Sequence, residues 1–555
     1  MKILVAEPMS PAALDLLRRQ PGFEVIESNP KEYEQHLAGC EAMLVRSAVK
    51  VKADTLAKAP KLRVIGRAGV GVDNVDLSAA TAAGVLVMNT PGGNAVSVAE
   101  HTLALMLALA RMIPEANAST RAGKWEKKKF LGNELRGKTL GIVGLGNIGQ
   151  EVVRRARGFE MRIIASDPYV APATAADLGV ELLAFEDLVA QSDYISLHVA
   201  LTPETRHMIN AQSIAQMKPG VRIINCARGE LIDQDALSDA LNSGKVAGAG
   251  LDVFSPEPLP EGHPLLSAPN LIATPHIAGS TEEAQEIVGI RIVEQLVEYL
   301  LHGVAINAVN MPAVAPEQYR AISPYIELAE RLGRFASFIA PDNPQAVRIT
   351  YRGRIAELNT NLLRNAALAG VLGRSLAARA NLVNAMQLAS QRNLTVTEAH
   401  QPRGGATDSI QIEIIAPASA TAVTGGVVMD KPRLLSIDGI PVEITLAGHL
   451  IYMRNIDVPG VIGHVGGILG RNQVNIANFS LGRQEAPPGA RETARGRGPR
   501  RGGHPRVRAD SGRIALPPRC QARGDRRAGR IGARAAEFLP FEGGPVAALF
   551  PCVLS

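Results

Sequence analysis

The sequence has 555 residues, a length that corresponds to about three to four domains at roughly 150 residues each. Hydrophobic residues make up 46% and charged residues 20%, which excludes a wholly disordered chain, a collagen-like chain and a disulfide-stapled miniprotein. The net charge is +6, but residues 486–555 hold 14 Arg, no Lys and 5 acidic residues, so the other 485 residues carry a balance of −3. The basic charge therefore indicates no nucleic-acid partner for the main part of the chain.

The cysteines and the apolar runs indicate a cytoplasmic protein. Four cysteines stand at no metal-like or disulfide-like spacing, as is typical of a reducing compartment, and we expect no metal site. The apolar start of the chain ends at Glu7 and reads as a first strand rather than a signal peptide. The longest apolar run, 103–110, is far short of the roughly 20 residues of a membrane helix, so we expect no membrane contact.

Short apolar runs alternate with helical segments in the first hundred residues. Strands are expected at 3–6, 43–45, 64–65 and 85–88, with helices at 11–20 and 52–58. This alternation predicts a parallel α/β layer. The helix expected at 97–113 has Ser97 as its predicted N-cap and Glu100 at capping-box spacing, and because it is apolar nearly all round it should be buried.

A second βαβ series begins near residue 138. Strands are expected at 142–143, 163–166, 194–198, 222–225, 248–253 and 271–273, which predicts a doubly wound domain. A long helix at 281–302 precedes a boundary near 312.

A different pattern follows, with helices at 317–339 and 361–372 and strands around 347–351, 410–415, 434–437 and 442–444. Asp438-Gly439 between the last two is a hairpin signal, so a separate α+β module is expected. A β-α-β unit follows at 450–481. After Glu485, Arg, Gly and Pro supply 34 of 70 residues, and this composition predicts disorder.

A dinucleotide site is predicted after the first strand of the second series. Gly144, Gly146 and Gly149 form a G-x-G-x-x-G motif between a strand and a helix. The first glycine allows a tight turn, and the second allows a close approach of the pyrophosphate. The third allows the helix to pack against the strand. Asp167 ends the next strand, where a carboxylate accepts hydrogen bonds from the ribose hydroxyls. No Arg or Lys stands beside Asp167, so NAD is favoured over NADP.

Three polar residues follow the ends of later strands, where ligands bind in open α/β sheets. His276 suits the base that takes a hydroxyl proton during hydride transfer. Glu257 fits the role of the carboxylate that orients the imidazole and raises its pKa. Arg228 suits a guanidinium that binds a substrate carboxylate and polarises the neighbouring carbonyl.

Segments 66–74, 225–230, 252–258 and 274–279 resemble the D-isomer-specific 2-hydroxyacid dehydrogenases, in particular long members with an extra module and an ACT regulatory domain. The resemblance implies a Rossmann-like doubly wound NAD-binding domain (99–285) inserted in a flavodoxin-like substrate domain (1–98 and 286–312). An α+β allosteric or substrate-binding module (313–446), a partial ferredoxin-like ACT domain (447–485) and the disordered tail (486–555) follow.

The same resemblance assigns further residues. It implies Arg228, Glu257 and His276 as catalytic residues. It adds to the NAD contacts Val70, Asn147, Ile148, Cys226, Ala227, Arg228, Asp252, His276 and Gly279. It implies substrate contacts from Arg46, Ser47, Arg67, Asn94, Arg228 and His276. Lys127 or Lys129 is expected to reach the site of a neighbouring subunit.

The implied reaction is NAD-dependent oxidation of a phosphorylated 2-hydroxy acid, 3-phospho-D-glycerate, to 3-phosphohydroxypyruvate in L-serine biosynthesis. A dehydrogenase for another D-2-hydroxy acid, such as 2-hydroxyglutarate, glycerate, glyoxylate or lactate, and an NAD-sensing binding module remain alternatives. A homodimer or homotetramer is expected.

The ACT-like segment implies an L-serine effector at Asn455, Asp457 and Asn475. No run that would complete an ACT fold is recognisable after Glu485, where the composition resembles translation in a shifted reading frame.

Overall fold

A computed structural model describes residues 1–373, 380–403, 407–456, 459–483 and 545–553. The chain divides into two compact units, Met1–Ala313 and Val314–Ser555, and each is described by itself.

The first unit begins with a parallel sheet of five strands. They are β1 (Lys2–Val5), β2 (Glu24–Glu27), β3 (Ala42–Val45), β4 (Val64–Arg67) and β5 (Leu86–Met88), and α1 (Pro11–Arg18), α2 (Ala53–Ala57) and α3 (Leu77–Ala82) connect them. The order β2-β1-β3-β4-β5 is that of flavodoxin-like folds. All four residues of β3 are buried, because helices cover both faces of such a sheet and favour continuous apolar strands.

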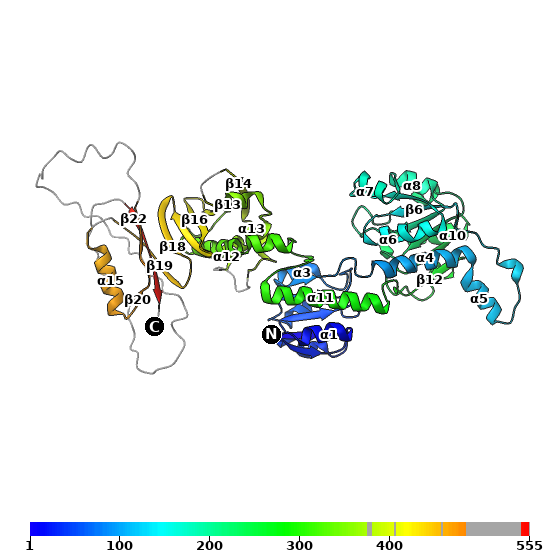
Figure 1. Ribbon diagram of the computed structural model, residues 1–555, viewed down its shortest axis with the longest axis horizontal. Coiled ribbons are helices and arrows are strands. Elements are labelled where there is room, and N and C mark those ends of the chain that lie inside the picture. Colours follow the sequence, from blue (N-terminus) through cyan, green and yellow to red (C-terminus); the bar gives the residue numbers. More distant parts are fainter. Residues whose placement is uncertain (374–379, 404–406, 457–458, 484–544, 554–555) are drawn as a thin grey trace, which may run out of the picture. The chain divides into compact units, whose positions relative to one another are not determined.

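The chain returns to this sheet through α11 (Glu282–His302), which packs beside α1 and β4 (Figure 1). A side chain on Gly66 in β4 would collide with Ile292 of α11, so the helix and the strand are in close contact. Beyond α11, Val309 N donates to Val87 O at 2.8 Å. The domain around the first sheet is therefore built from two separate stretches of sequence, with the second sheet inserted between them.

The inserted sheet has seven parallel strands in the order β12-β11-β10-β9-β6-β7-β8. They are β6 (Thr139–Val143), β7 (Arg162–Ser166), β8 (Glu181–Leu182), β9 (Tyr194–Leu197), β10 (Val221–Asn225), β11 (Val246–Leu251) and β12 (Leu271–Ala273). The helices are α6 (Asn147–Ala156), α7 (Pro172–Asp177), α8 (Phe185–Gln191), α9 (Ala211–Gln216) and α10 (Gln234–Asn242). The strand order reverses between β6 and β9, as in Rossmann folds, which confirms the predicted fold class.

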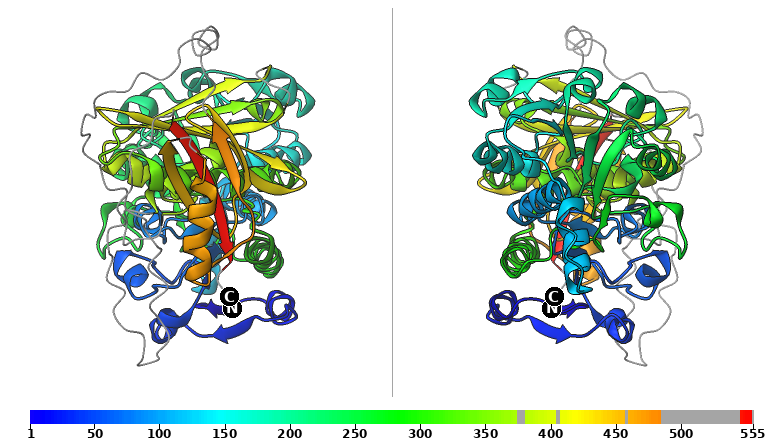
Figure 2. Two further views of the ribbon diagram at one scale, coloured as in Figure 1. Left: turned by 90° about the vertical axis from the view of Figure 1, so that its left-hand side faces the viewer. Right: turned by 90° about the vertical axis from the view of Figure 1, so that its right-hand side faces the viewer.

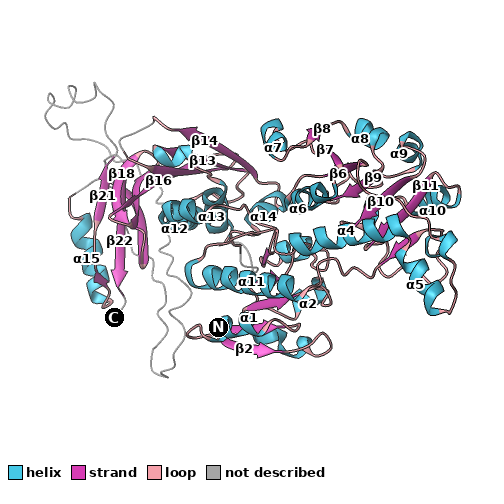
Figure 3. Cartoon of the chain, turned by 45° about the vertical axis from the view of Figure 1, so that its right-hand side comes forward, coloured by secondary structure: helices cyan, strands magenta, loops and turns pink. Residues whose placement is uncertain are grey.

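Helix α4 (Ala95–Arg111) packs against this sheet, and 10 of its 17 residues are buried, as predicted (Figure 3). The predicted cap is wrong, because α4 begins after Asn94 and Ser97 lies inside the helix. The hydroxyl of Ser97 instead shares a hydrogen bond of 2.8 Å with Thr281. Among the described residues no single helix is long and apolar enough to span a membrane; α4 and α5 (Ile113–Arg121) meet that test only together and are bent by 63°.

The second unit contains a mixed sheet of six strands in the order β14-β13-β15-β16-β17-β18. The strands are β13 (Ala346–Arg352), β14 (Thr395–Gln401), β15 (Ser409–Ile415), β16 (Ala420–Val428), β17 (Lys431–Ile437) and β18 (Ile440–Thr445). The helices are α12 (Pro316–Ile339), α13 (Asn361–Leu372) and α14 (Ala385–Gln391). Asp438 and Gly439 have φ angles of 49° and 79°, which fits the predicted hairpin between β17 and β18.

Two glycines allow α12 and α13 to cross closely. A Cβ atom on Gly333 would lie 2.1 Å from the carbonyl oxygen of Ala367, and one on Gly370 would lie 2.1 Å from that of Glu330. Because both obstacles are backbone atoms, the helices can approach this closely only without side chains at these positions.

A second sheet in this unit includes a strand from the tail. It is formed by β19 (His449–Ile456), β20 (Asn475–Ile476), β21 (Ser480–Arg483) and β22 (Pro545–Val553), with α15 (Val461–Arg471) on one face (Figure 2). β22 lies between β19 and β20 and pairs antiparallel with both and with β21. The prediction that 486–555 lacks regular structure is therefore wrong for residues 545–553. The other residues of this range, 486–544, 554 and 555, lie outside the described residues.

We expect Gly333→Ala to lower the free energy of unfolding of the second unit by about 1–3 kcal/mol, because the added methyl group forces α12 and α13 apart. Thermal and denaturant unfolding measure this change. Gly463→Ala in α15 is the matched control, since no described atom lies within 4 Å of the added Cβ. Equal stability of the two variants would contradict the close crossing.

Candidate active site

The glycine-rich turn joins β6 to α6 at the point where the strand order reverses. Gly144 has a φ of 96°, and a Cβ on Gly149 would lie 2.1 Å from Gly144 O. A Cβ on Gly146 would meet no described atom within 4 Å. The turn is therefore tight and closely packed beneath α6 but open at Gly146, next to Asn147 and Ile148 at the start of the helix. A phosphate group fits this opening, because the N-terminus of a helix favours negative charge.

Asp167 stands beside this turn, directly after β7. Its Oδ2 accepts a hydrogen bond from Leu145 N at 2.8 Å, and its Oδ1 accepts one from Tyr169 N at 2.9 Å. These bonds fix the carboxylate next to the glycine turn, where it suits the hydroxyl groups of a ribose attached to the bound phosphates.

His276 and Glu257 form a hydrogen-bonded pair at the carboxyl ends of β11 and β12. His276 Nδ1 lies 2.8 Å from Glu257 Oε2, and Phe254 N donates to Glu257 Oε1 at 3.0 Å. The side chains are 52% and 38% exposed, so Nε2 of the imidazole remains accessible to a small molecule.

The pair changes the acidity of both groups. The hydrogen bond to Glu257 is the largest influence on the pKa of His276. Together with the charges of Glu257 and Asp252 it raises this pKa above its ordinary value, against the opposing effects of burial and of the charge on Arg228. Burial alone would raise the pKa of Glu257, but the hydrogen bonds from His276 and Phe254 N outweigh it and lower that pKa. The pair therefore stabilises the imidazolium form of His276 relative to an isolated histidine.

A buried carboxylate holds the backbone that carries His276. Asp252 is completely buried and accepts hydrogen bonds from Thr274 Oγ1 at 2.6 Å, Ile277 N at 2.9 Å and Ala278 N at 2.8 Å. His276 N donates to Asp252 O at 2.9 Å. His276 has a φ of 56°, and this uncommon conformation persists because Asp252 holds the residues on both sides.

Arg228 follows β10 and pairs with a residue that the sequence reasoning did not select. Its Nη2 lies 2.8 Å from Asp73 Oδ2, and its Nη1 donates to Ala227 O at 2.7 Å. Within the described residues it makes no hydrogen bond with His276 or Glu257. Its charge nevertheless lowers the pKa of both groups, which brings the three residues into one electrostatic site.

Arg46 and Ser47 lie on a loop after β3 that is fixed by a second missed residue, Glu7. The Glu7 carboxylate is buried and accepts hydrogen bonds from Arg46 N at 2.8 Å, Ala48 N at 3.1 Å and Val49 N at 2.9 Å. The position of Glu7, directly after the apolar run of β1, is the sequence signal that could have identified it.

Arg67 ends β4, and burial lowers the pKa of its guanidinium. Its Nε atom is buried without a partner among the described residues, so the site has an unused donor. Asn94, which directly precedes α4, lies beside Gly279, since a Cβ on Gly279 would lie 2.6 Å from Asn94 Nδ2. Asn89 Nδ2 donates to Val70 O at 2.6 Å.

Cys226 is buried between β10 and Arg228, and burial raises the pKa of its thiol to about 12. The thiol is therefore uncharged, and Cys226 does not act as a nucleophile.

Two parts of the chain match family models. Residues 103–278 match the model described as D-isomer specific 2-hydroxyacid dehydrogenase, NAD binding domain. Residues 321–438 match the D-3-phosphoglycerate dehydrogenase intervening domain.

Curated relatives match over most of the chain. D-3-phosphoglycerate dehydrogenase from Methanocaldococcus jannaschii is 43% identical over 487 residues, which are 87% of this chain and 93% of that protein. The protein of that name from Bacillus subtilis is 40% identical over 486 residues, which are 87% of this chain and 92% of that protein. The chain belongs to the D-3-phosphoglycerate dehydrogenase family.

Solved structures resemble more than half of this chain. A glyoxylate reductase from Paecilomyes thermophila has a TM-score of 0.50 and 33% identity, and covers 57% of this chain and 99% of its own. D-lactate dehydrogenase from Escherichia coli also has a TM-score of 0.50 and 33% identity, and covers 56% and 100%. The chain is therefore an NAD-dependent dehydrogenase of the D-3-phosphoglycerate dehydrogenase family, with NAD as its cofactor.

The residues expected to bind an effector or to reach another subunit are only partly described. Asn475 begins β20 and is exposed. Only the backbone of Asn455 is described, in β19, and Asp457 lies outside the described residues. Lys127 is exposed, and Lys129 Nζ lies 2.6 Å from Glu126 Oε1. These roles stay predictions.

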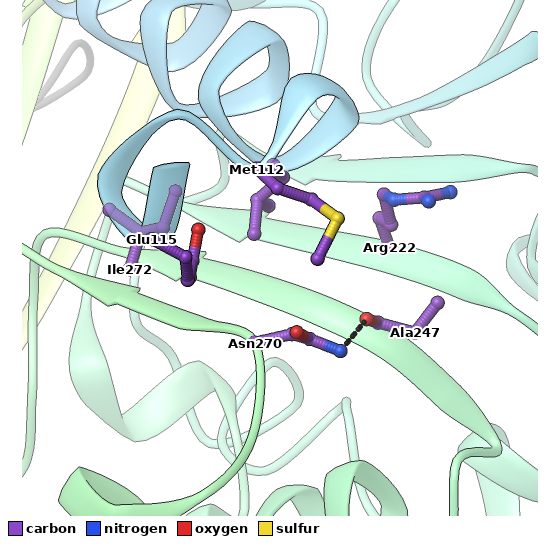
Figure 4. A pocket seen from close by; sticks show the side chains of 7 residues that line it. Met112, Glu115, Arg222, Ala247, Asn270 and Ile272 are labelled. Atoms are coloured by element: carbon purple, nitrogen blue, oxygen red, sulfur yellow. Dashed lines mark hydrogen bonds between the residues drawn. The ribbon is translucent and has the colours of Figure 1, made fainter. Parts of the chain in front are cut away.

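A small pocket of about 70 Å³ lies elsewhere in this dehydrogenase (Figure 4). Arg222, Ala247 and Asn270 line it from the amino-terminal ends of β10, β11 and β12, together with Met112 and Glu115 near the end of α4. His276, Glu257 and Arg228 lie at the opposite ends of these strands, so the pocket is separate from the candidate site.

We expect Glu257→Gln to lower the pKa of His276 toward its ordinary value, because the substitution removes the negative charge that stabilises the imidazolium. A pH titration of the His276 ring signals by NMR measures the change. The exposed Glu261 lies on the same loop, and Glu261→Gln should leave the titration almost unchanged. An equal shift in both variants would contradict a specific pair.

Proposed function

We propose that this chain oxidises 3-phospho-D-glycerate to 3-phosphohydroxypyruvate with NAD, the entry reaction of the phosphorylated pathway of L-serine biosynthesis. The observation that carries the proposal is the His276–Glu257 pair, which lies with Arg228 at the carboxyl edge of an NAD-binding sheet. The names of the relatives, and the match of residues 321–438 to an intervening domain named for this enzyme, support the choice of substrate.

In the proposed mechanism, His276 acts as the general base. The glycine turn and Asp167 would hold NAD, which when bound would supply the acceptor for the hydride of the carbon that carries the hydroxyl group. Nε2 of His276 takes the hydroxyl proton, and the imidazolium that forms is stabilised by Glu257 at Nδ1. Because Glu257 raises the pKa of His276, oxidation requires a pH high enough to provide the neutral imidazole, whereas reduction uses the imidazolium as the acid.

The arginines of the site would bind the two anionic ends of the substrate. Arg228 suits the carboxylate, because a guanidinium makes two parallel hydrogen bonds to such a group. Arg46 and Arg67 suit the phosphate; the buried Nε of Arg67 lacks a partner among the described residues and is available to an oxyanion. No observation on the described residues favours another 2-hydroxy acid or an NAD-sensing module.

We also propose a cytoplasmic homodimer or homotetramer that binds L-serine through Asn455, Asp457 and Asn475. Only the family resemblance supports the effector and the assembly. Light scattering and serine titration calorimetry on the full chain test them.

We expect 3-phospho-D-glycerate to give the highest kcat/KM when it is assayed with NAD beside D-glycerate, D-lactate and D-2-hydroxyglutarate. The reason is that only this substrate supplies a phosphate to Arg46 and Arg67. A clear preference for a non-phosphorylated acid would contradict the proposal.

We expect His276→Ala to reduce kcat by about 10²–10⁴-fold while the affinity for NAD changes little, because the substitution removes the base and leaves the glycine turn intact. Steady-state kinetics and NAD titration calorimetry measure the two effects. The exposed His302 at the end of α11 provides the control variant His302→Ala. Turnover of His276→Ala within a few-fold of the parent would exclude His276 as the acid–base group.

A further inference from the structure

Arg228 is held by Asp73 on one particular edge of its guanidinium. Arg228 Nε donates to Asp73 Oδ1 at 3.3 Å, and Nη2 lies 2.8 Å from Oδ2, so the carboxylate lies along the Nε–Nη2 edge. Nη1 donates to Ala227 O at 2.7 Å. The Asp73 carboxylate therefore does not occupy the end of the guanidinium between Nη1 and Nη2, and a guanidinium presents N–H donors on that end as well.

The segment that carries Asp73 is itself fixed in place. The next residue, Asn74, donates through Nδ2 to Arg46 O at 2.9 Å and to Val49 O at 2.7 Å. Val75 is buried. Asp73 is therefore presented from a rigid segment, although its own side chain is 67% exposed.

The backbone near Asp73 also lies against the guanidinium. A Cβ atom on Gly71 would lie 2.1 Å from Arg228 Nη2 and 2.7 Å from Asp73 Oδ2. The absence of a side chain at residue 71 lets the segment approach Arg228 this closely. Two independent features, a carboxylate and a glycine, thus fit the same orientation of one arginine.

The solvent exposure of the Arg228–Asp73 pair argues against a mainly stabilising role. Arg228 is 28% exposed and Asp73 67% exposed, and ion pairs this open to solvent add little to the stability of a fold. Asp73 also lies near other charged groups of the site, since the charges of Arg228 and Arg46 lower the pKa of Arg67 and those of Asp73 and Glu7 raise it. The Asp73 carboxylate can therefore orient the guanidinium of Arg228 even if the ion pair adds little to the free energy of unfolding.

We propose that Asp73 is a positioning residue for the reaction: it holds the Nε–Nη2 edge of Arg228 and leaves the Nη1–Nη2 end for the carboxylate of the incoming substrate. The inference rests on the proposed function, in which Arg228 binds that carboxylate. Asp73 follows β4 of the first sheet, whereas Arg228 follows β10 of the inserted sheet. Arg228 is therefore oriented only while these two segments are in contact, and this contact links the arrangement of the two sheets to substrate binding.

The test compares Asp73→Asn with the wild type and with Asp76→Asn. Asp76 is exposed and caps α3 by accepting from Ala79 N at 2.9 Å. Asn caps helices about as well as Asp, so Asp76→Asn removes a charge three residues away without changing Arg228. We expect Asp73→Asn to raise KM for 3-phospho-D-glycerate and to lower kcat, with a loss of about 10- to 100-fold in kcat/KM. The NAD dissociation constant and the melting temperature should stay near the values of the wild type.

Other outcomes overturn the inference. A lower KM in Asp73→Asn would show that Asp73 competes with the substrate for Arg228, and kinetics equal to those of Asp76→Asn would show that the pair has no role. Losses in NAD affinity and melting temperature that match the loss in activity would indicate a structural role only. If the wild type prefers another 2-hydroxy acid, the proposed function fails, but the same comparison with that acid still tests Asp73, because every such substrate carries the carboxylate.

Discussion

The candidate site depends on one buried carboxylate. Asp252 has no contact with solvent, and its oxygens receive the hydroxyl of Thr274 and the backbone N–H groups of Ile277 and Ala278. Burying a carboxylate is costly unless hydrogen bonds replace its hydration, so these donors must converge on Asp252. Their convergence forces the residue between them, His276, into a left-handed conformation and brings its ring to Glu257.

The sequence predicted the parts of the site that are encoded locally. Gly144, Gly149 and Asp167 belong to a short motif, and His276, Glu257 and Arg228 each follow a recognisable strand, so the topology of a parallel sheet alone brings them to one edge. Asp73 was missed because its partner lies 155 positions away, and no local pattern specifies such a contact. Glu7 has a local signal, its place directly after the apolar run of β1, but its partners lie about 40 positions away and that signal does not identify them. Ser97 was misread as a cap because its spacing to Glu100 fits, whereas its real partner is Thr281.

The fold was predictable where strands are apolar and less so where they are polar. β2 and β14 lie at sheet edges and contain no buried residue, so hydrophobic periodicity does not reveal them. β22 is a different case. The composition of 486–555 predicts disorder as an average, but a strand of nine residues needs only its own short apolar segment and two neighbours with which to pair.

The hydrogen bond between Ser97 and Thr281 has a consequence for motion. The chain leaves the first sheet just before Ser97 and returns to it just after Thr281, so the two crossings are tied together at one point. Connections of this kind, at the ends of helices, are where a rotation between two sheets would be absorbed. Any rotation of the inserted sheet relative to the first sheet would have to bend the chain at both connections together, and it would separate Arg228 from Asp73.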